Sequence, residues 1–250
     1  MNTERTLGLM GALPEEIHTL QQHLKLDDTK TIAGRTYYYG ACPTAPHIQI
    51  ILTMARVGKV AAASTATTLL QHFAVDEILF TGVAGSAHDS VRIGDVVIAR
   101  DLWQHDLDAT PIFKPFEIPY LNRTFLSADT LLRDLLTTAA TNTLKELAPE
   151  ASVHFGDIVS GDQFVTARDI RNDIVRRIPS ARAIEMEGAA VAQVCFEHEK
   201  PFAVIRTISD DADEKAPKNF KHFLNTIATP YAENIVQQFL SLYAQQYPRQ

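Results

Sequence analysis

Short apolar runs alternate with longer stretches of helical periodicity along most of the chain, and this alternation limits the choice of fold more than any other feature of the sequence. Four of the runs have the length and composition of buried strands: Leu7–Ala12, Ile48–Met54, Glu77–Thr81 and Phe202–Ile208. Strands that alternate with helices predict a layered α/β fold with a largely parallel sheet.

Further elements fill the gaps between these runs. A helix begins at Pro14, because proline suits the first helical position. The C-terminal apolar residues recur every three or four positions, and Thr229-Pro230 within that pattern predicts two helices rather than one. The other predicted strands are Asp95–Ala99, Val153–Ser160 and Ala183–Met186, and the other predicted helices are Val60–Phe73, Leu131–Leu147, Ile170–Arg177 and Glu187–Phe196.

No linker or change of composition divides the chain, so the sequence predicts one domain over residues 1–250. The stretch from Leu102 to Asn122 is irregular, and its prolines would stiffen it into a long ordered loop. Long loops in compact domains are often functional, but an ordinary surface loop has the same appearance.

Composition and charge exclude several classes of partner. The formal net charge is −7, from 23 basic and 30 acidic residues, so we expect neither a nucleic-acid groove nor a basic membrane patch. The longest uncharged stretch, Thr36–Ala55, contains prolines, a glycine and a histidine and is unlike a membrane helix. Cys42 and Cys195 form neither a disulfide framework nor a metal motif, and the N-terminus lacks the layout of a signal peptide. We therefore expect a cytoplasmic protein.

Familiar cofactor motifs fail on inspection. Val57-Gly58-Lys59 resembles the end of a phosphate-binding loop, but Thr53 occupies the position of its first glycine. Gly82-Val83-Ala84-Gly85 lacks the three glycines of a dinucleotide-binding fingerprint. The histidines have no metal-ligand spacing, and His105-Asp106 comes nearest to a cluster. We expect neither a cofactor nor a metal.

Several carboxylates follow predicted strands, and open α/β sheets bind ligands at the carboxyl ends of their strands. Glu16 follows the first strand, Glu185 and Glu187 flank Met186, and Asp210 follows the run that ends at Ile208. A role at a helix N-terminus or in a turn accounts for each carboxylate and is favoured by the pattern alone. Sequence separation cannot show whether these residues meet.

A set of short strings nevertheless stands in an order that resembles one enzyme family. The strings begin at Gly11 (GALPEE), Val57 (VGKVAA), Thr81 (TGVAG), Ile93 (IGDVV), Gly156 (GDIVSGDQF), Ile184 (IEMEGAA) and Ile205 (IRTISD). Together they resemble the 5′-methylthioadenosine/S-adenosylhomocysteine nucleosidases of the purine nucleoside phosphorylase and uridine phosphorylase superfamily. The resemblance implies a three-layer α/β sandwich with a mixed, largely parallel central sheet. It also implies hydrolysis of the N-glycosidic bond between adenine and a 5′-thio-substituted ribose, in methionine salvage.

The resemblance implies two catalytic residues, Asp210 and Glu16. Asp210 is similar to the general acid that protonates the purine N7, a task that requires a raised carboxyl pKa. Glu16 is similar to the residue that activates the attacking water. It is preferred to Glu15 because the family places that carboxylate four positions after the alanine that is Ala12 here.

The resemblance also implies a set of substrate-binding residues. Glu187 would accept hydrogen bonds from both ribose hydroxyls, and Met186 would pack on the sugar. Phe164 would stack on the purine, and the backbone of Val165 would bind its edge. The remaining implied positions are Val57 and Phe220 around the 5′-thio group, Glu185 beside Met186, and Arg206 and Ser209 as supports for Glu187 and Asp210.

In the family a loop of a partner subunit closes this pocket. Here that loop begins at His105-Asp106 and offers Ile112, Phe113 and Phe116, so the resemblance implies a homodimer that binds a small nucleoside. Three departures bear on substrate preference. The segment Pro111–Pro119 is unlike that of the commonest family members. Val83 stands where the family often has a serine that binds the catalytic aspartate, and Arg56 stands where a small residue is common.

Three other functions stay open at this point. A nucleoside phosphorylase needs cationic phosphate ligands, and Arg56 is the main residue that offers one. A hydrolase of another purine nucleoside, such as futalosine, would use the same aspartate. A catalytically silent nucleoside-binding module is the third, because a fold does not prove a function.

Overall fold

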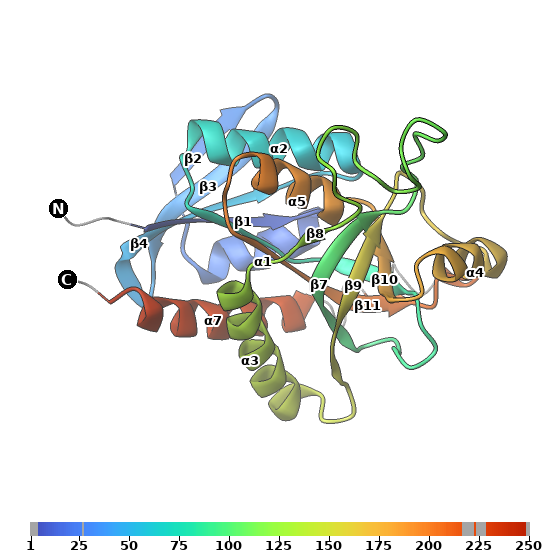
Figure 1. Ribbon diagram of the computed structural model, residues 1–250. Coiled ribbons are helices and arrows are strands. Elements are labelled where there is room, and N and C mark those ends of the chain that lie inside the picture. The colour runs from blue at the N-terminus through green and yellow to red at the C-terminus, as the bar shows by residue number, and fades with distance from the viewer. Residues whose placement is uncertain (1–4, 27, 217–222, 224–228, 249–250) are drawn as a thin grey trace.

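The computed structural model describes residues 5–26, 28–216, 223 and 229–248, with the backbone alone described at Glu15, Glu16 and Thr229. A single sheet crosses its centre (Figure 1). The strands are β1 (Arg5–Gly11), β2 (Asp28–Ile32), β3 (Arg35–Cys42), β4 (Ala45–Met54), β5 (Glu77–Phe80), β6 (Val83–Ser86), β7 (Val96–Gln104), β8 (Leu126–Ser127), β9 (Val153–Ser160), β10 (Ala181–Glu185) and β11 (Phe202–Asp210).

The strand order in this sheet is β2-β3-β4-β1-β5-β11-β6-β10-β9-β7-β8. β11 also pairs with β7, so the strands from β11 to β7 close on themselves at one end of the sheet. Parallel pairings join β1 to β4 and β5, β11 to β5 and β6, and β9 to β7 and β10, while the remaining described pairings are antiparallel. The prediction of a mixed, largely parallel sheet is confirmed.

Helices cover both faces of the sheet (Figure 1). α2 (Lys59–His72) and α5 (Gly188–Glu197) pack on one face, while α1 (Pro14–His23), α3 (Thr130–Leu147) and α7 (Thr229–Gln246) pack on the other. The predicted three-layer sandwich is therefore confirmed. α4 (Arg168–Arg177) packs against the closed end of the sheet through Ile174.

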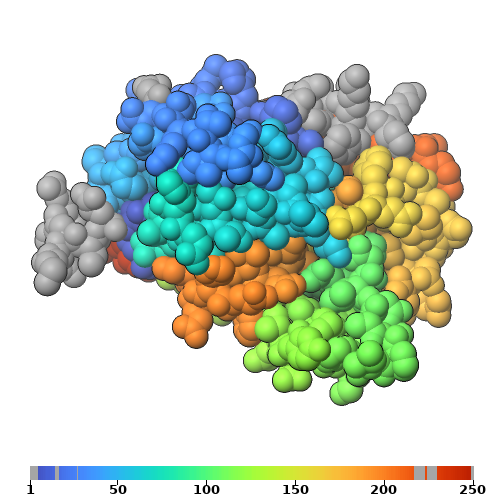
Figure 2. Space-filling view, turned by 90° about the horizontal axis from the view of Figure 1, so that it is seen from above, coloured from blue at the N-terminus to red at the C-terminus, as the bar shows by residue number. Residues whose placement is uncertain are grey.

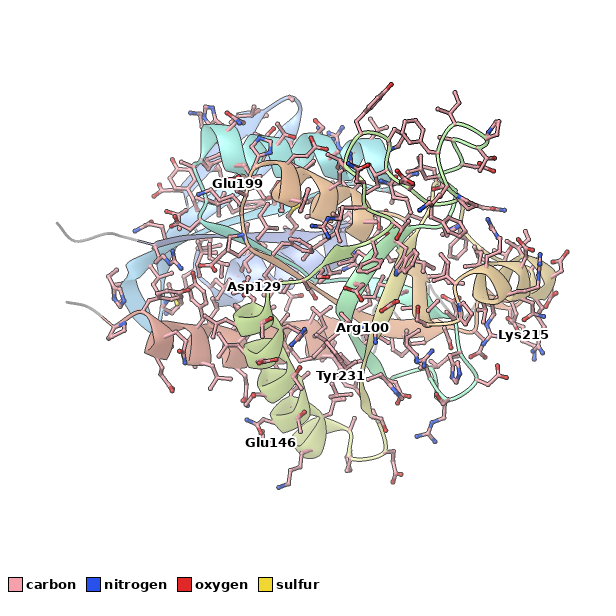
Figure 3. The ribbon with its side chains drawn as sticks, in the orientation of Figure 1. Arg100, Asp129, Glu146, Glu199, Lys215 and Tyr231 are labelled. Atoms are coloured by element: carbon pink, nitrogen blue, oxygen red, sulfur yellow. The ribbon has the colours of Figure 1, made fainter. Side chains whose placement is uncertain are left out.

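Local sequence explains where α3 begins and which face it buries. Asp129, labelled at this end of the helix in Figure 3, accepts a hydrogen bond from the amide of Leu132 at 2.9 Å. Such a cap satisfies one of the amides that a helix N-terminus leaves unpaired. Leu132, Leu136 and Ala139 are buried at the helical spacing, and the helix differs from the predicted Leu131–Leu147 only by one residue at its start.

Some elements differ from the predicted ones. The hairpin of β2 and β3 was not predicted, because β2 is polar and mostly exposed and so lacks an apolar signal. The predicted strand Glu77–Thr81 is β5, and the residues that follow it form a separate strand, β6. β7 continues to Gln104, so the irregular segment begins later than predicted. The second of the predicted C-terminal helices begins at Thr229 as α7, whereas the first falls almost wholly outside the described residues.

No helix in the described part of the chain is both long and apolar enough to cross a membrane.

Candidate active site

A cavity of about 330 Å³ lies where β10 and β11 end. It brings together Glu185, Glu187 and Asp210, whose proximity the sequence could not show. The described residues that line it are Ala12, Leu13, Val57, Gly82, Val83, Ala84, Gly85, Phe164, Ile184, Glu185, Met186, Glu187, Arg206, Ser209 and Asp210. A ligand in this cavity would therefore meet carboxylates on a largely apolar wall.

Asp210 ends β11 and is 1% exposed. The register of β11 against β6 shifts between Ile208 and Asp210, and a bulge of this kind reorients the residues at a strand end. Burial raises the pKa of the Asp210 carboxyl, against the lowering effect of hydrogen bonds from the Ser209 hydroxyl and the Ala212 amide. A carboxyl that keeps its proton to higher pH is the kind of group that general acid catalysis needs.

Ser209 supplies the hydroxyl hydrogen bond to Asp210 that Val83, in place of the family's serine, does not provide. Val83 lines the cavity and has no hydroxyl to offer Asp210. The Ser209 hydroxyl instead donates to Oδ2 of Asp210 at 2.7 Å, and the Ala212 amide donates to Oδ1 at 2.9 Å. Asp210 is thus anchored from its own strand and the following turn.

Glu187 occupies the N-cap position of α5 and is 5% exposed. Its Oε1 accepts a hydrogen bond from the amide of Gly58 at 2.8 Å. Gly58 itself is the N-cap of α2, so the helix N-termini of α2 and α5 meet at this carboxylate. The positive ends of both helices favour its negative charge.

Glu185 is tied to the protein through both of its oxygens. Oε2 forms an ion pair with Nη2 of Arg206 at 2.7 Å, and both residues are almost completely buried. The Ser160 hydroxyl donates to Oε1, and the amides of Glu187 and Gly188 donate to the same carboxylate. Although Glu185 lines the cavity, this arrangement favours a supporting role over the predicted contact with substrate.

Arg206 therefore supports a different residue from the one predicted. We had expected it to orient Glu187, but its guanidinium pairs with Glu185 and lies 4.1 Å from the centre of the Phe80 ring. The other predicted support is confirmed as a contact, since Ser209 binds Asp210 directly.

The predicted apolar residues are divided between the cavity and the core. Val57, Phe164 and Met186 line the cavity, and Phe164 keeps 45% of its surface exposed. Val165 is buried in the cluster that packs β9 and β10 against α4, and its side chain is absent from the described cavity lining.

Two predicted site residues lie outside what the structure describes. The backbone of Glu16 belongs to the first turn of α1, directly after the cavity residues Ala12 and Leu13, but its side chain is not described. Phe220 falls outside the described residues altogether.

Arg56 does not bring its charge to the cavity. Its guanidinium donates to the carbonyl of Gly34 in the β2–β3 turn at 2.6 Å, on an exposed part of the surface. Among the described lining residues the cation is Arg206, which is already paired with Glu185.

The segment between β7 and β8 carries the residues predicted to reach a partner subunit. Ile112 is 83% exposed. Phe116, by contrast, packs within its own chain, edge-on to the Trp103 ring and 5.3 Å from the guanidinium carbon of Arg177. Ile112 is therefore the better candidate for an external contact.

Two residues at the site were not singled out from the sequence. Gly58 supplies the amide that binds Glu187, and Ser160 binds Glu185 and the amide of Ala189. Both belong to strings that carried the resemblance, VGKVAA and GDIVSGDQF, and that membership was the available signal. In the described part of the chain, no group of three or more His, Cys, Asp or Glu side chains could hold a metal ion.

Comparison with known proteins identifies the family. The family model of the phosphorylase superfamily matches residues 6–241. The 5′-methylthioadenosine/S-adenosylhomocysteine nucleosidase of Tolumonas auensis is 35% identical over 94% of this chain and 99% of its own. The structure of the nucleosidase of that name from Neisseria meningitidis, solved with methylthio-immucillin-A, matches with a TM-score of 0.86. The two chains are 30% identical, over 95% of this chain and 99% of that one. Futalosine hydrolase of Helicobacter pylori has a TM-score of 0.84 at 31% identity, over 95% and 98% of the two chains. The chain thus belongs to the phosphorylase superfamily and, within it, to the family of 5′-methylthioadenosine/S-adenosylhomocysteine nucleosidases.

Proposed function

We propose that this protein hydrolyses the N-glycosidic bond of 5′-methylthioadenosine, of S-adenosylhomocysteine or of both, releasing adenine and the thioribose. The observation that carries the proposal is the buried Asp210, with its raised pKa, in the same cavity as the buried Glu187. Membership of the nucleosidase family supports the same reaction.

Asp210 acts as the general acid. As the bond between C1′ and N9 breaks, its electron pair moves to the purine, and the proton of Asp210 passes to N7. Adenine then leaves as a neutral molecule rather than as an anion. The hydrogen bonds from Ser209 and Ala212 stabilise the aspartate that remains.

Water completes the reaction at C1′. The ribose carries positive charge in the transition state, and the nearby Glu187 carboxylate stabilises that charge. Glu16 takes a proton from the water as its oxygen bonds to C1′. This role is supported by the position of its backbone, at the start of α1 and beside the cavity residues Ala12 and Leu13.

Binding uses the apolar wall and Glu187. Phe164 stacks on the purine, Val165 binds the purine edge through its backbone, and Met186 packs on the sugar. Val57 and Phe220 enclose the 5′-thio group. Glu187 accepts hydrogen bonds from the 2′- and 3′-hydroxyls while the Gly58 amide fixes its orientation.

The active enzyme is proposed to be a cytoplasmic homodimer that serves methionine salvage. Figure 2 shows α2 (cyan), α5 (orange) and the segment 105–123 (green) on one face of the molecule. On these elements Val60, Ile112 and Tyr120 are each more than 80% exposed, at 81%, 83% and 88%. We propose that a second copy of the chain covers these exposed apolar side chains. Sedimentation at micromolar concentration tests this, and a purely monomeric active enzyme would contradict it.

A direct assay distinguishes hydrolysis from the alternatives. The protein is incubated with 5′-methylthioadenosine, with and without phosphate, and the products are separated by chromatography. Free adenine formed equally well without phosphate supports the proposal, whereas a phosphate requirement with a sugar-1-phosphate product would indicate a phosphorylase. The ion pair between Arg206 and Glu185 argues against phosphate binding. Arg206 is the cationic side chain among the described lining residues, and its charge is already paired with a carboxylate.

Hydrolysis of futalosine is the second candidate. It is supported by the futalosine hydrolase of Helicobacter pylori, whose fold matches this chain with a TM-score of 0.84. Turnover of futalosine but not of either adenosine thioether would favour it. Binding of these nucleosides without any turnover would favour a silent binding module.

A further inference from the structure

Three charged residues form a cluster at the rim of the cavity, and we call Lys59, Asp106 and Asp162 the rim cluster. Lys59 is the first residue of α2, Asp106 follows β7, and Asp162 follows β9. All three stand outside the described lining of the cavity. They come from parts of the chain that are far apart in sequence, so their meeting is a property of the fold.

Hydrogen bonds join each member of the rim cluster to the other two. Nζ of Lys59 donates to Oδ1 of Asp106 at 2.6 Å, and the amide of Lys59 donates to Oδ1 of Asp162 at 2.7 Å. The amide of Asp162 donates to Oδ2 of Asp106 at 2.9 Å. Asp106 thus binds the start of α2 through one oxygen and the loop after β9 through the other.

The rim cluster is partly shielded from solvent. The side chains of Lys59 and Asp106 are 17% and 32% exposed, so their ion pair is screened less than a fully exposed one. Although burial opposes it, hydrogen bonds from Lys59 and from the Asp162 amide hold the pKa of the Asp106 carboxyl below its ordinary value. Asp106 is therefore ionised at neutral pH and pairs with the Lys59 ammonium.

The rim cluster connects two parts of the substrate site. On one side, Gly58 directly precedes Lys59 and donates its amide to Glu187. On the other side, Phe164 lies two residues after Asp162 in the loop that follows β9. A Cβ atom at Gly161 would collide with the His105 ring, so this loop lies directly against the residue that precedes Asp106.

We propose that Lys59 and Asp106 are positioning residues, which hold the Gly58 amide and the Phe164 loop at a fixed separation around the nucleoside. The inference rests on the proposed function for what Glu187 and Phe164 bind. Asp210 is anchored separately, by Ser209 and Ala212. Loss of the rim cluster therefore weakens substrate binding through Glu187 and Phe164. It slows the chemical step less, through the positive charge that Glu187 stabilises on the ribose.

Steady-state kinetics with 5′-methylthioadenosine test the proposal. Asp106→Ala and Lys59→Met should each raise KM roughly 3- to 10-fold, as expected for loss of a partly buried charge-assisted hydrogen bond, with kcat within about twofold of wild type. The double variant should be no worse than the more affected single variant, because both changes break one unit. Asp106→Glu and Lys59→Arg should restore part of the loss.

Asp89→Ala is the matched control. Like Asp106, Asp89 pairs with a cationic side chain, that of Arg171. Asp89 is 95% exposed and lies outside the cavity lining and the rim cluster, so Asp89→Ala should keep the wild-type KM. An unchanged KM in Asp106→Ala would overturn the proposal. So would a fall in kcat at constant KM, or an equal rise in KM in Asp89→Ala.

Amide hydrogen exchange of the unliganded protein gives a readout that does not depend on turnover. In Asp106→Ala the amides of residues 58, 59 and 162 should exchange at least about tenfold faster, because one anchor of each segment is lost, while α3 exchanges as in wild type. Unchanged exchange at these amides would overturn the proposal even if wild type cleaves the substrate. If wild type cleaves no nucleoside, the proposed function fails. The exchange result then still decides whether the rim cluster holds the start of α2 and the loop after β9 in place.

Discussion

Asp210 and Glu187 are both buried carboxylates of one cavity, yet their surroundings differ in kind. Asp210 has a single hydroxyl and one amide as described donors, and burial dominates its pKa. Glu187 stands at the meeting point of two helix N-termini, where a negative charge is favoured. Asp210 is therefore suited to donating a proton, and Glu187 is suited to accepting hydrogen bonds from sugar hydroxyls.

Asp210→Asn should lower kcat at least about 10²-fold, because general acid catalysis typically contributes that much and an amide has no proton of suitable pKa to give. KM should change little by comparison. The measurement is the release of adenine from 5′-methylthioadenosine, with Asp211→Asn, an exposed neighbour, as the control. Near-normal turnover by Asp210→Asn would remove Asp210 from its role.

The buried Asp210 should also make stability depend on pH. Burial raises its pKa above the ordinary 3.8. A group whose pKa is raised on folding adds stability that is complete below its unfolded-state pKa and is lost as the pH rises through its folded-state pKa. The free energy of unfolding of wild type should therefore fall, relative to that of Asp210→Asn, as the pH rises from about 4.

Urea unfolding of both proteins from acid to neutral pH measures that difference. A difference that stays constant across the range would mean that the carboxyl titrates alike in the folded and unfolded chains.

The residues of the site were only partly predictable. The resemblance identified Asp210, Glu187, Met186 and Phe164, which line the cavity. It could not show that the Glu185 carboxylate is bound by Arg206 and Ser160, because a sequence pattern gives a residue's type and not its hydrogen-bond partners.

At the scale of elements, the strands that could be predicted from the sequence are those with buried apolar runs. β9 has the predicted bounds, and it is buried along its second half. β2, with Asp28 and Lys30 on an exposed strand, has no such signal. β7 was cut short in the prediction because the charged residues Arg100 and Asp101 interrupt its apolar run, and the structure places ion pairs there.

The junction before α2 offers a test at this scale. Gly58 has φ 97° and ψ 156°, a conformation that is essentially restricted to glycine. Gly58→Ala should cost about 1–3 kcal/mol of stability and should also raise KM, because the amide that binds Glu187 would shift. Thermal unfolding and steady-state kinetics measure the two effects.

Gly94→Ala provides the comparison for that variant. Gly94 also has a positive φ, of 94°, but a Cβ there would meet no atom within 4 Å, and it lies outside the cavity lining. This variant should lose stability and keep its KM. Equal kinetic effects in both variants would show that the loss at Gly58 is a general consequence of strain.

At the scale of the whole molecule, we propose that residues 1–250 fold as one domain. The apolar clusters on the two faces of the sheet share its strands, so neither helical layer has a core of its own. Unfolding should therefore be a single transition. Fluorescence of Trp103, the one tryptophan, and far-ultraviolet circular dichroism should give the same midpoint in urea, and separate midpoints would indicate independent domains.

The closure of β11 onto β7 has a consequence for how the molecule behaves in crowded solution. A strand at the edge of a sheet can pair with another chain and start aggregation. Because the closed end leaves its strands paired on both sides, the described sheet ends only at β2 and β8. β2 carries Asp28 and Lys30 on an exposed strand, and β8 is two residues long. Short or charged edges discourage such pairing, so the sheet that forms the active site also protects the protein from edge-to-edge association.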